Sequence, residues 1–317
     1  MPKLGKIVFF GTPEFAVATL EALVAAGREP VAVVTRPAAP VGRGQEVQDP
    51  PVAVAARAHG LEVLQPERVR DEAFIARMRE LAPDLFVVVA FGQIFPAELL
   101  EVPKRGAVNL HGSLLPKYRG ASPIQSAISN GEKKTGVTTM LMEEELDSGP
   151  ILLQAEVEIG RSETAGELAE RLAPLGAELV VETVEKLEIG KGIKPRKQRE
   201  ESASYATKFS KADGRMNWAL EAEELYNRMR ALDPWPGMTA NFKGRPIKVL
   251  WGVPMTWEKG PSGFTGTYLG LRQGKMAILC GGDTVFGIEE LQRPGKKALR
   301  ASDFVNGERI RVGERFA

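Results

Sequence analysis

Apolar residues recur in two alternating patterns along the first 190 residues: short continuous runs and helical repeats. The runs Lys6–Phe10 and Leu85–Ala90 are apolar at nearly every position, which is typical of strands buried on both faces of a parallel sheet. The same reasoning predicts further strands over residues 31–35, 62–64, 107–111, 137–141 and 151–155, and helices over 52–59, 71–81, 123–130 and 163–189. This alternation indicates a doubly wound or mixed α/β domain.

A further helix is expected directly after the first strand. Thr12 and Pro13 supply an N-cap and a proline at the first helical position. Val17, Leu20 and Val24 recur at helical spacing and predict its buried face. The turn before it lacks the Gly-x-Gly-x-x-Gly fingerprint, so the pattern does not favour a dinucleotide-dependent dehydrogenase.

The composition changes at Gly190. Residues 190–207 are rich in charge, contain Gly and Pro, and read as a basic linker. Beyond it, one helix over residues 220–231 precedes short strands predicted over 247–250, 266–271, 276–280 and 284–291. We therefore expect an α/β domain over 1–189, the linker over 190–207, and a small β-barrel of the oligonucleotide-binding (OB-like) type over 208–317.

The overall composition is that of a water-soluble globular protein of 317 residues. Cys280 is the single cysteine, so no internal disulfide forms, and its apolar neighbours indicate a packed thiol. With two histidines, a zinc site is not expected. There is no apolar run long enough to cross a bilayer and no signal-peptide pattern at the N-terminus, so a cytoplasmic protein is expected.

Charge is distributed unevenly between the two halves. Residues 1–190 carry 19 Lys and Arg against 27 Asp and Glu, a net charge of −8, whereas residues 191–317 carry 23 against 14, a net charge of +9. Such asymmetry suggests that the C-terminal half contacts an anionic macromolecule. Ordinary surface charge, which keeps a protein in solution, is the alternative explanation.

The segment from Asn109 to Gly120 is the strongest candidate for chemistry. Asn109 and His111 are two positions apart on a predicted strand, so their side chains should point to the same face. In open α/β sheets, ligands bind beyond the carboxyl ends of the strands, where His111 would lie. On this pattern alone, a core Asn and His satisfied by their neighbours remains an equal alternative.

These twelve residues resemble the signature of the folate-dependent formyltransferases, which place an Asn and a His two apart before Ser-Leu-Leu-Pro and a basic turn with glycine. In that family a catalytic Asp follows some tens of residues later, and Asp147, which precedes Ser-Gly-Pro, matches it. The resemblance implies a Rossmann-like formyltransferase domain. It also implies 10-formyltetrahydrofolate as the co-substrate, an amine as the acceptor, and no metal.

By this resemblance, Asn109, His111 and Asp147 are the catalytic residues. An amide N–H of Asn109 can stabilise the negative charge that develops on the formyl oxygen. A protonated His111 can be a second donor, and a neighbouring carboxylate favours the charged form of an imidazole. Asp147 is the candidate for that carboxylate, and it could also accept the proton of the attacking amine.

The resemblance also locates the folate. Ser113, Leu114, Leu115 and Pro116 would line its crevice, and the loop with Phe91, Gly92 and Ile94 would present backbone groups to the pterin. A glycine at position 92 lets a ligand approach the backbone closely. Core packing is the alternative for Phe91 and Ile94.

Three features favour methionyl-initiator tRNA as the acceptor, which would be formylated for translation initiation. The long loop Arg36–Pro51 resembles the insertion that engages the acceptor stem in this branch of the family, with Arg43 as the matching arginine. Gln45 and Glu46 stand where relatives often have lysines, which weakens the electrostatic part of that comparison. The linker adds phosphate-binding candidates at Lys191, Lys194, Arg196 and Lys197.

The third feature is the C-terminal half, in which Tyr205–Asp213 and Arg230–Gly237 resemble the second domain of the tRNA-dependent branch. A formyltransferase that acts on a nucleotide-linked amino sugar remains the main alternative. Enzymes acting on glycinamide ribonucleotide lack the appended domain, whereas hydrolysis of the donor and a catalytically silent RNA-binding scaffold are further possibilities. A monomer is expected, because a large RNA ligand needs no partner subunit.

Overall fold

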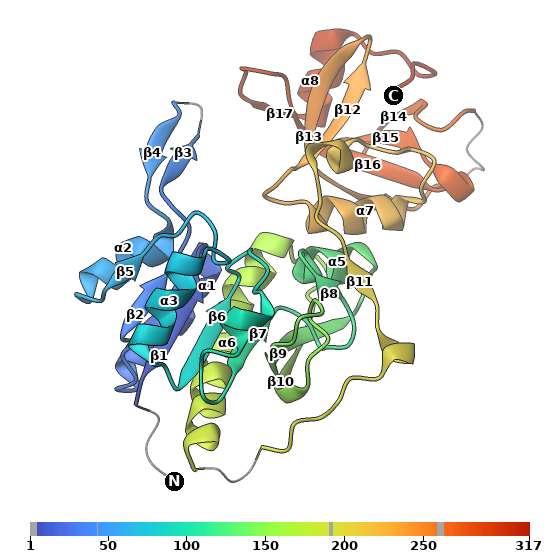
Figure 1. Cartoon of the computed structure of the whole chain (residues 1–317). Helices are drawn as coiled ribbons and strands as arrows, with labels where there is room; N and C mark the ends of the chain where they lie inside the picture. The colour runs from blue at the N-terminus through green and yellow to red at the C-terminus, as the bar shows by residue number, and fades with distance from the viewer. Residues whose placement is uncertain (1–4, 43, 190–192, 259–262) are drawn as a thin grey trace. The chain divides into compact units, whose positions relative to one another are not determined.

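The computed structural model describes residues 5–42, 44–189, 193–258 and 263–317. The chain forms two compact units, and each is described by itself (Figure 1). The first comprises Met1–Pro123, Lys134–Glu158 and Leu168–Thr207. The second comprises Ile124–Lys133, Ile159–Glu167 and Lys208–Ala317.

A seven-stranded sheet organises the first unit, in the order β10-β9-β7-β6-β1-β2-β5. Its parallel strands are β1 (Ile7–Gly11), β2 (Ala32–Val34), β5 (Val63–Leu64), β6 (Leu85–Val89) and β7 (Ala107–His111). Two antiparallel strands, β9 (Lys134–Leu141) and β10 (Ile151–Glu158), complete it. Strands β2 and β5 follow β1 on one side of it, and β6 then pairs with the other side of β1. The strand order therefore reverses between β1 and β6, and their carboxyl ends form the switch point at which ligands bind in such sheets.

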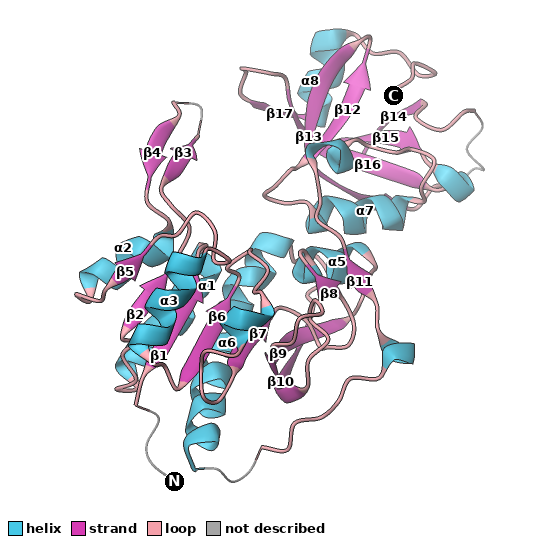
Figure 2. Cartoon of the chain, viewed as in Figure 1, coloured by secondary structure: helices cyan, strands magenta, loops and turns pink. Residues whose placement is uncertain are grey.

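Helices cover both faces of this sheet (Figure 2). Phe10, Phe86 and Val88 point to the face covered by α3 (Glu72–Leu81) and α4 (Ala97–Leu100). The long helix α6 (Ala165–Ile189) packs on the opposite face, where Gly176 lies close to Leu110. The predicted α/β domain with a Rossmann-like mixed sheet is therefore confirmed.

The first helix differs from its prediction in one respect. Helix α1 (Glu14–Ala25) buries Ala16, Thr19, Leu20 and Leu23, so the buried face lies one position away from the predicted Val17 and Val24. The N-cap is Pro13 and not the predicted Thr12, so the helix has no side-chain cap, and the Thr12 hydroxyl donates to the carbonyl of Phe91 instead (3.4 Å). Thr12 therefore joins the loops after β1 and β6 instead of capping the helix.

The long loop Arg36–Pro51 contains a short hairpin that the sequence did not predict. Its strands are β3 (Ala39–Val41) and β4 (Glu46–Gln48), and helix α2 (Pro51–Ala58) follows. Three residues per strand are too few to be distinguished from a loop by periodicity. Arg43, which lies between the two strands in the sequence, is outside the described residues.

The second unit is built on a six-stranded antiparallel sheet. Strands β12 (Met238–Phe242), β13 (Arg245–Met255), β16 (Val285–Gln292), β15 (Lys275–Leu279) and β14 (Tyr268–Arg272) are neighbours in that order, and β17 (Ala298–Arg300) pairs with β16. Helices α7 (Ala222–Ala231) and α8 (Ala301–Glu308) contribute to the same core. Cys280 is 1% exposed, and burial raises the pKa of its thiol to about 12, which confirms a packed cysteine.

Two short segments from the N-terminal part of the sequence belong to this second unit. Helix α5 (Pro123–Ser129) leads into one of them, and Ile159–Glu167 is the other. Arg230 of α7, 5% exposed, donates to the carbonyl of Glu163 (2.9 Å) and to Asn227 Oδ1 (2.5 Å). Among the described residues, no helix is long and apolar enough to cross a membrane.

Candidate active site

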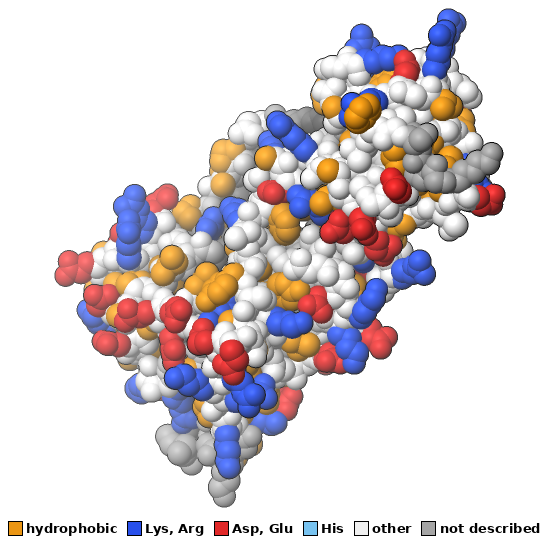
Figure 3. All heavy atoms as spheres, turned by 90° about the vertical axis from the view of Figure 1, so that its right-hand side faces the viewer, with side chains coloured by type: hydrophobic (Ala, Val, Ile, Leu, Met, Phe, Trp, Pro, Cys, Tyr) orange, Lys and Arg blue, Asp and Glu red, His pale blue; other side chains and the backbone are white. Residues whose placement is uncertain are grey.

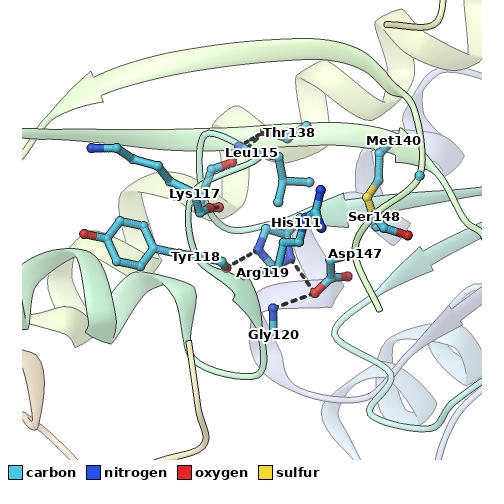
Figure 4. Close-up of polar contacts among 12 residues, drawn as sticks. His111, Leu115, Lys117, Tyr118, Arg119, Gly120, Thr138, Met140, Asp147 and Ser148 are labelled. Carbon is cyan, nitrogen blue, oxygen red and sulfur yellow. Dashed lines mark hydrogen bonds and ion pairs between the residues drawn. The ribbon is translucent and has the colours of Figure 1, made fainter. Parts of the chain in front are cut away.

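His111 is the last residue of β7, at the carboxyl edge of the sheet. It is 5% exposed, and its Nε2 lies 2.8 Å from the carbonyl oxygen of Tyr118. Its Nδ1 lies 3.5 Å from Asp147 Oδ2 (Figure 4). Both ring nitrogens thus face acceptors, and an imidazole with a hydrogen on each nitrogen matches both.

Asp147 reaches His111 from the loop between β9 and β10. Its Oδ2 also accepts a hydrogen bond from the Gly120 N–H (2.8 Å), and its side chain is 12% exposed. Its backbone has a φ of 52°, in the left-handed region that few residues adopt. Across the described chain, Oδ1 has no hydrogen-bond partner, so one carboxylate oxygen faces His111 and the other is available.

Asn109 precedes His111 by two residues on β7, so the two side chains share one face of the sheet. Its strand neighbours are Val88 of β6 and Met140 of β9. The side chain is partly exposed, unlike that of His111. The sequence-predicted trio therefore lies on one strand end and the loop beside it, with contact between His111 and Asp147.

The turn after β7 is built from its own polar groups. The Ser113 hydroxyl donates to the carbonyl of Lys117 (2.6 Å), and the Thr138 hydroxyl donates to the carbonyl of Ser113 (2.6 Å). Ser113 and Leu115 are buried, whereas Leu114 and Pro116 are partly exposed. Of the four predicted folate contacts here, Leu114 and Pro116 are the ones whose side chains remain accessible.

The loop after β6 lies beside the switch point of the sheet. Phe91 is 2% exposed and packs edge-to-face against Phe10 and Phe95, so its side chain belongs to the core. Gly92 has a φ of 79°, and its carbonyl accepts a hydrogen bond from Arg36. Ile94 is 80% exposed. This loop therefore offers a backbone turn and one free apolar side chain to a ligand.

The segment predicted as a basic linker packs along the first unit. Arg196 forms an antiparallel bridge with Ile151, and β11 (Tyr205–Ala206) pairs in parallel with β8 (Arg119–Gly120). The side chains of Lys194, Arg196 and Lys197 are exposed. Lys191, like Arg43, lies outside the described residues.

The charged side chains do not form a continuous basic surface on the face drawn in Figure 3. Lys and Arg lie there among Asp and Glu, so the positive charge is interrupted. Contacts to an anionic polymer on this face would have to be made by separate cationic side chains.

Four contacts at the site were not predicted from the sequence. The Tyr118 carbonyl and the Gly120 N–H are backbone groups, which no side-chain pattern reveals. Arg119 is a cation in the turn after Pro116, and it is fully buried, which is rare for a charged side chain. Gln198 is buried behind Asp147, and its only sequence signal is that it is uncharged within the run Arg196–Glu201.

Both parts of the sequence match known formyl transferase families. Residues 5–184 match the family described as Formyl transferase, and residues 208–309 match Formyl transferase, C-terminal domain. The methionyl-tRNA formyltransferase of Geobacter metallireducens is 44% identical over 98% of both chains. That of Symbiobacterium thermophilum is 45% identical over 98% of this chain and 95% of its own.

A solved structure shares the fold at lower identity. The N-formyltransferase of Helicobacter canadensis, in complex with folinic acid and dTDP-3-aminofucose, aligns with 91% of this chain and 99% of its own. The TM-score is 0.64 at 18% identity. With both family matches and full-length relatives above 40% identity, the chain belongs to the formyl transferase family, among the methionyl-tRNA formyltransferases.

Proposed function

We propose that this chain transfers the formyl group of 10-formyltetrahydrofolate to the amino group of methionyl-initiator tRNA, using Asn109, His111 and Asp147. The observation that carries the proposal is the contact between His111 and Asp147 at the carboxyl end of β7, with Asn109 on the same strand. The full-length similarity to methionyl-tRNA formyltransferases supports the choice of acceptor.

Asn109 and His111 act on the formyl oxygen. The partly exposed amide of Asn109 donates to that oxygen as negative charge develops on it. The 3.5 Å from His111 Nδ1 to Asp147 is longer than a usual hydrogen bond, so the hydrogen on Nδ1 is not fully engaged by the carboxylate and can be shared with a formyl oxygen near the ring plane. The shorter contact between Nε2 and the Tyr118 carbonyl keeps the ring in place meanwhile.

Asp147 accepts the proton of the amine. Its Oδ2 is held by the Gly120 N–H and faces the imidazole, while Oδ1 is open to an incoming group. A carboxylate in this position accepts the proton released when the amine attacks, directly or through a water. The methionine amine must be neutral to attack, and the proton that it then loses can go to the folate nitrogen as that nitrogen leaves.

The co-substrate binds beside the switch point of the sheet. Gly92 provides backbone groups, and the accessible side chains of Ile94, Leu114 and Pro116 provide apolar contacts for a flat ring system. Phe91, Ser113 and Leu115 are buried beneath these groups and support them. The folinic acid complex of the H. canadensis protein is in keeping with a formylated folate as the donor.

The tRNA is bound by the hairpin loop, the linker and the second unit. Arg43, Lys191, Lys194, Arg196 and Lys197 contact phosphates. Residues 1–189 form the catalytic domain, 190–207 the linker, and 208–317 an OB-like, tRNA-binding domain. Hydrogen bonds from residues near the C-terminus support a closed barrel: Ala317 N donates to the carbonyl of Asn241 in the edge strand β12, and Phe316 N to that of Gly266 ahead of the other edge strand, β14 (both 2.8 Å). The enzyme acts as a cytoplasmic monomer.

The test is an acceptor comparison with 10-formyltetrahydrofolate as donor. Methionyl-initiator tRNA, methionyl-elongator tRNA and a nucleotide-linked amino sugar are assayed side by side. Formylation of the initiator tRNA alone is the expected result. Transfer to the sugar alone would keep the catalytic residues and overturn the acceptor, and transfer to none of the three would overturn the proposal.

A further inference from the structure

A buried glutamine lies directly behind the proposed catalytic carboxylate. Gln198 is 5% exposed, and its Nε2 lies 2.7 Å from the carbonyl oxygen of Asp147 and 2.8 Å from that of Gly149. An amide NH₂ has two hydrogens, so both are used on the backbone at and just after Asp147. Gln198 thus holds the backbone of this loop, while the Gly120 N–H holds the side chain of Asp147.

The orientation of this amide is fixed by Arg119. Arg119 Nε donates to Gln198 Oε1 (3.0 Å), which turns the NH₂ group of Gln198 toward the two carbonyls. The terminal nitrogens of the same guanidinium pair with both carboxylate oxygens of Glu200, at 3.0 and 2.7 Å. Arg119 also immediately precedes Gly120, the residue that donates to Asp147.

Arg196, two residues before Gln198, connects to the strands beside His111. Its Nη2 donates to Gln154 Oε1 (2.6 Å), and the Gln154 amide donates to the Leu115 carbonyl and the Thr138 hydroxyl. Thr138 is the strand partner of His111. We call Arg196–Glu200 the brace, because its side chains contact the structures that carry both His111 and Asp147.

We propose that Gln198 is a positioning residue for catalysis: it holds the loop of Asp147 so that the carboxylate stays beside His111 and within reach of the attacking amine, and so makes the brace a part of the active site. This rests on the proposed role of Asp147. Misplacing a catalytic group by about an ångström lowers a rate strongly without abolishing substrate binding.

The chemistry of the amide makes the inference specific. A carboxylate at position 198 could still accept from Arg119, but it would turn an oxygen toward the carbonyls of Asp147 and Gly149. An acceptor facing two acceptors is repelled, so the loop must move. An apolar side chain of similar length would leave the two carbonyls without their donor.

The test uses the full-length enzyme with three variants. Gln198→Glu replaces the donor to the two carbonyls with an acceptor. Gln198→Met removes the donor and keeps a flexible chain of similar length. One variant remains usable if the other fails to fold. The matched control is Gln273→Glu, the same chemical change at an exposed position in the turn after β14. Formyl transfer is measured well below the lowest melting temperature.

We expect kcat to fall about tenfold to a hundredfold in both Gln198 variants, with KM for methionyl-tRNA within about twofold of wild type. A second readout is the His111 ring resonance in a His59→Gln background, in which it is the only histidine signal. This signal should shift in Gln198→Glu and remain unchanged in Gln273→Glu.

A lower melting temperature with wild-type kcat and an unmoved His111 signal would overturn the inference, because Gln198 would then serve folding alone. Asp147→Asn, assayed in parallel, separates the two claims. If it is inactive while both Gln198 variants run at the wild-type rate, the positioning role is wrong and the proposed function stands. If it retains the wild-type rate, the proposed role of Asp147 fails.

Discussion

The guanidinium of Arg119 is fully buried, yet its charge is paired with a carboxylate at the surface, that of Glu200. The side chains are 0% and 64% exposed, respectively. The hydrogen bonds from Arg119 lower the pKa of Glu200, and those to Glu200 raise the pKa of Arg119. A buried cation without its partner is costly, so this pair ties the brace to the turn that carries Gly120.

The first prediction concerns the stability of the protein in acid. Because the pKa of Glu200 is lowered by Arg119, the pair contributes stability above the ordinary glutamate pKa of about 4.3, and this is lost as the pH falls through the lowered value. The melting temperature of wild type should therefore exceed that of Glu200→Gln at neutral pH, and the two should converge in acid.

Thermal unfolding of both proteins across this range is the measurement, with exposed Glu201→Gln as the control. Other carboxylates titrate equally in both proteins and cancel in the comparison. A difference that stays constant with pH would show that the charge of Glu200 is not what stabilises Arg119.

The second prediction concerns the two residues on β7. Asn109→Ala should lower kcat by about 10²–10³-fold, because it removes a donor to the developing negative charge. His111→Ala should lose a similar amount, since it removes the second donor. Steady-state kinetics with both substrates provide the check, and a variant that keeps more than about a tenth of the wild-type rate would refute the role of that residue.

A third prediction follows from the close packing of Gly149. A Cβ at this position would lie 1.8 Å from the backbone oxygen of Leu141, so the Asp147 loop has to shift to accept it. Gly149→Ala should cost about 1–3 kcal/mol of stability and lower kcat. Gly307→Ala, in helix α8 with its nearest neighbour 3.6 Å away, is the control and should not destabilise the protein. Denaturant titrations measure the stability of both variants. If Gly149→Ala and Gly307→Ala change the stability equally, the close packing at Gly149 does not matter.

A fourth prediction concerns the linker and salt. Phosphate contacts release counterions, so the affinity for tRNA should fall steeply as salt rises. Replacing Lys194 and Lys197 with Gln should reduce the slope of log Kd against log salt by about two, one for each lysine that no longer pairs with a phosphate. Exposed Arg79→Gln is the control. If the affinity for tRNA does not change with salt, contacts between these lysines and phosphates do not contribute to binding.

The sheet of the first unit could be predicted because its strands carry their own signal. Leu85–Val89 is buried at every position, as its continuous apolar run requires. The hairpin β3–β4 is too short to show a periodicity, so only its pairing in the fold reveals it. The strand Met238–Phe242 alternates apolar and polar residues, so its sequence does carry a strand signal that the prediction left out.

Some residues of the site could also be predicted from the sequence, and others could not. His111 and Asp147 were identified by spacing and family resemblance, and the structure brings them into contact. Gln198 could not be identified, because its role depends on a fold that places residues 51 positions apart side by side. Its place in a run of charged residues favoured a solvated linker, whereas the buried carbonyls at Asp147 and Gly149 require a donor there.

The most direct test of the account is single-turnover formyl transfer by Asp147→Asn at saturating 10-formyltetrahydrofolate and methionyl-initiator tRNA. Asn is nearly the same size as Asp and tolerates the left-handed backbone of position 147, so the change removes little but the charge and the proton acceptor. We predict a rate at least about 10²-fold below wild type with an unchanged Kd for tRNA. A rate above about a tenth of wild type would contradict the central claim that the His111 and Asp147 pair performs the transfer.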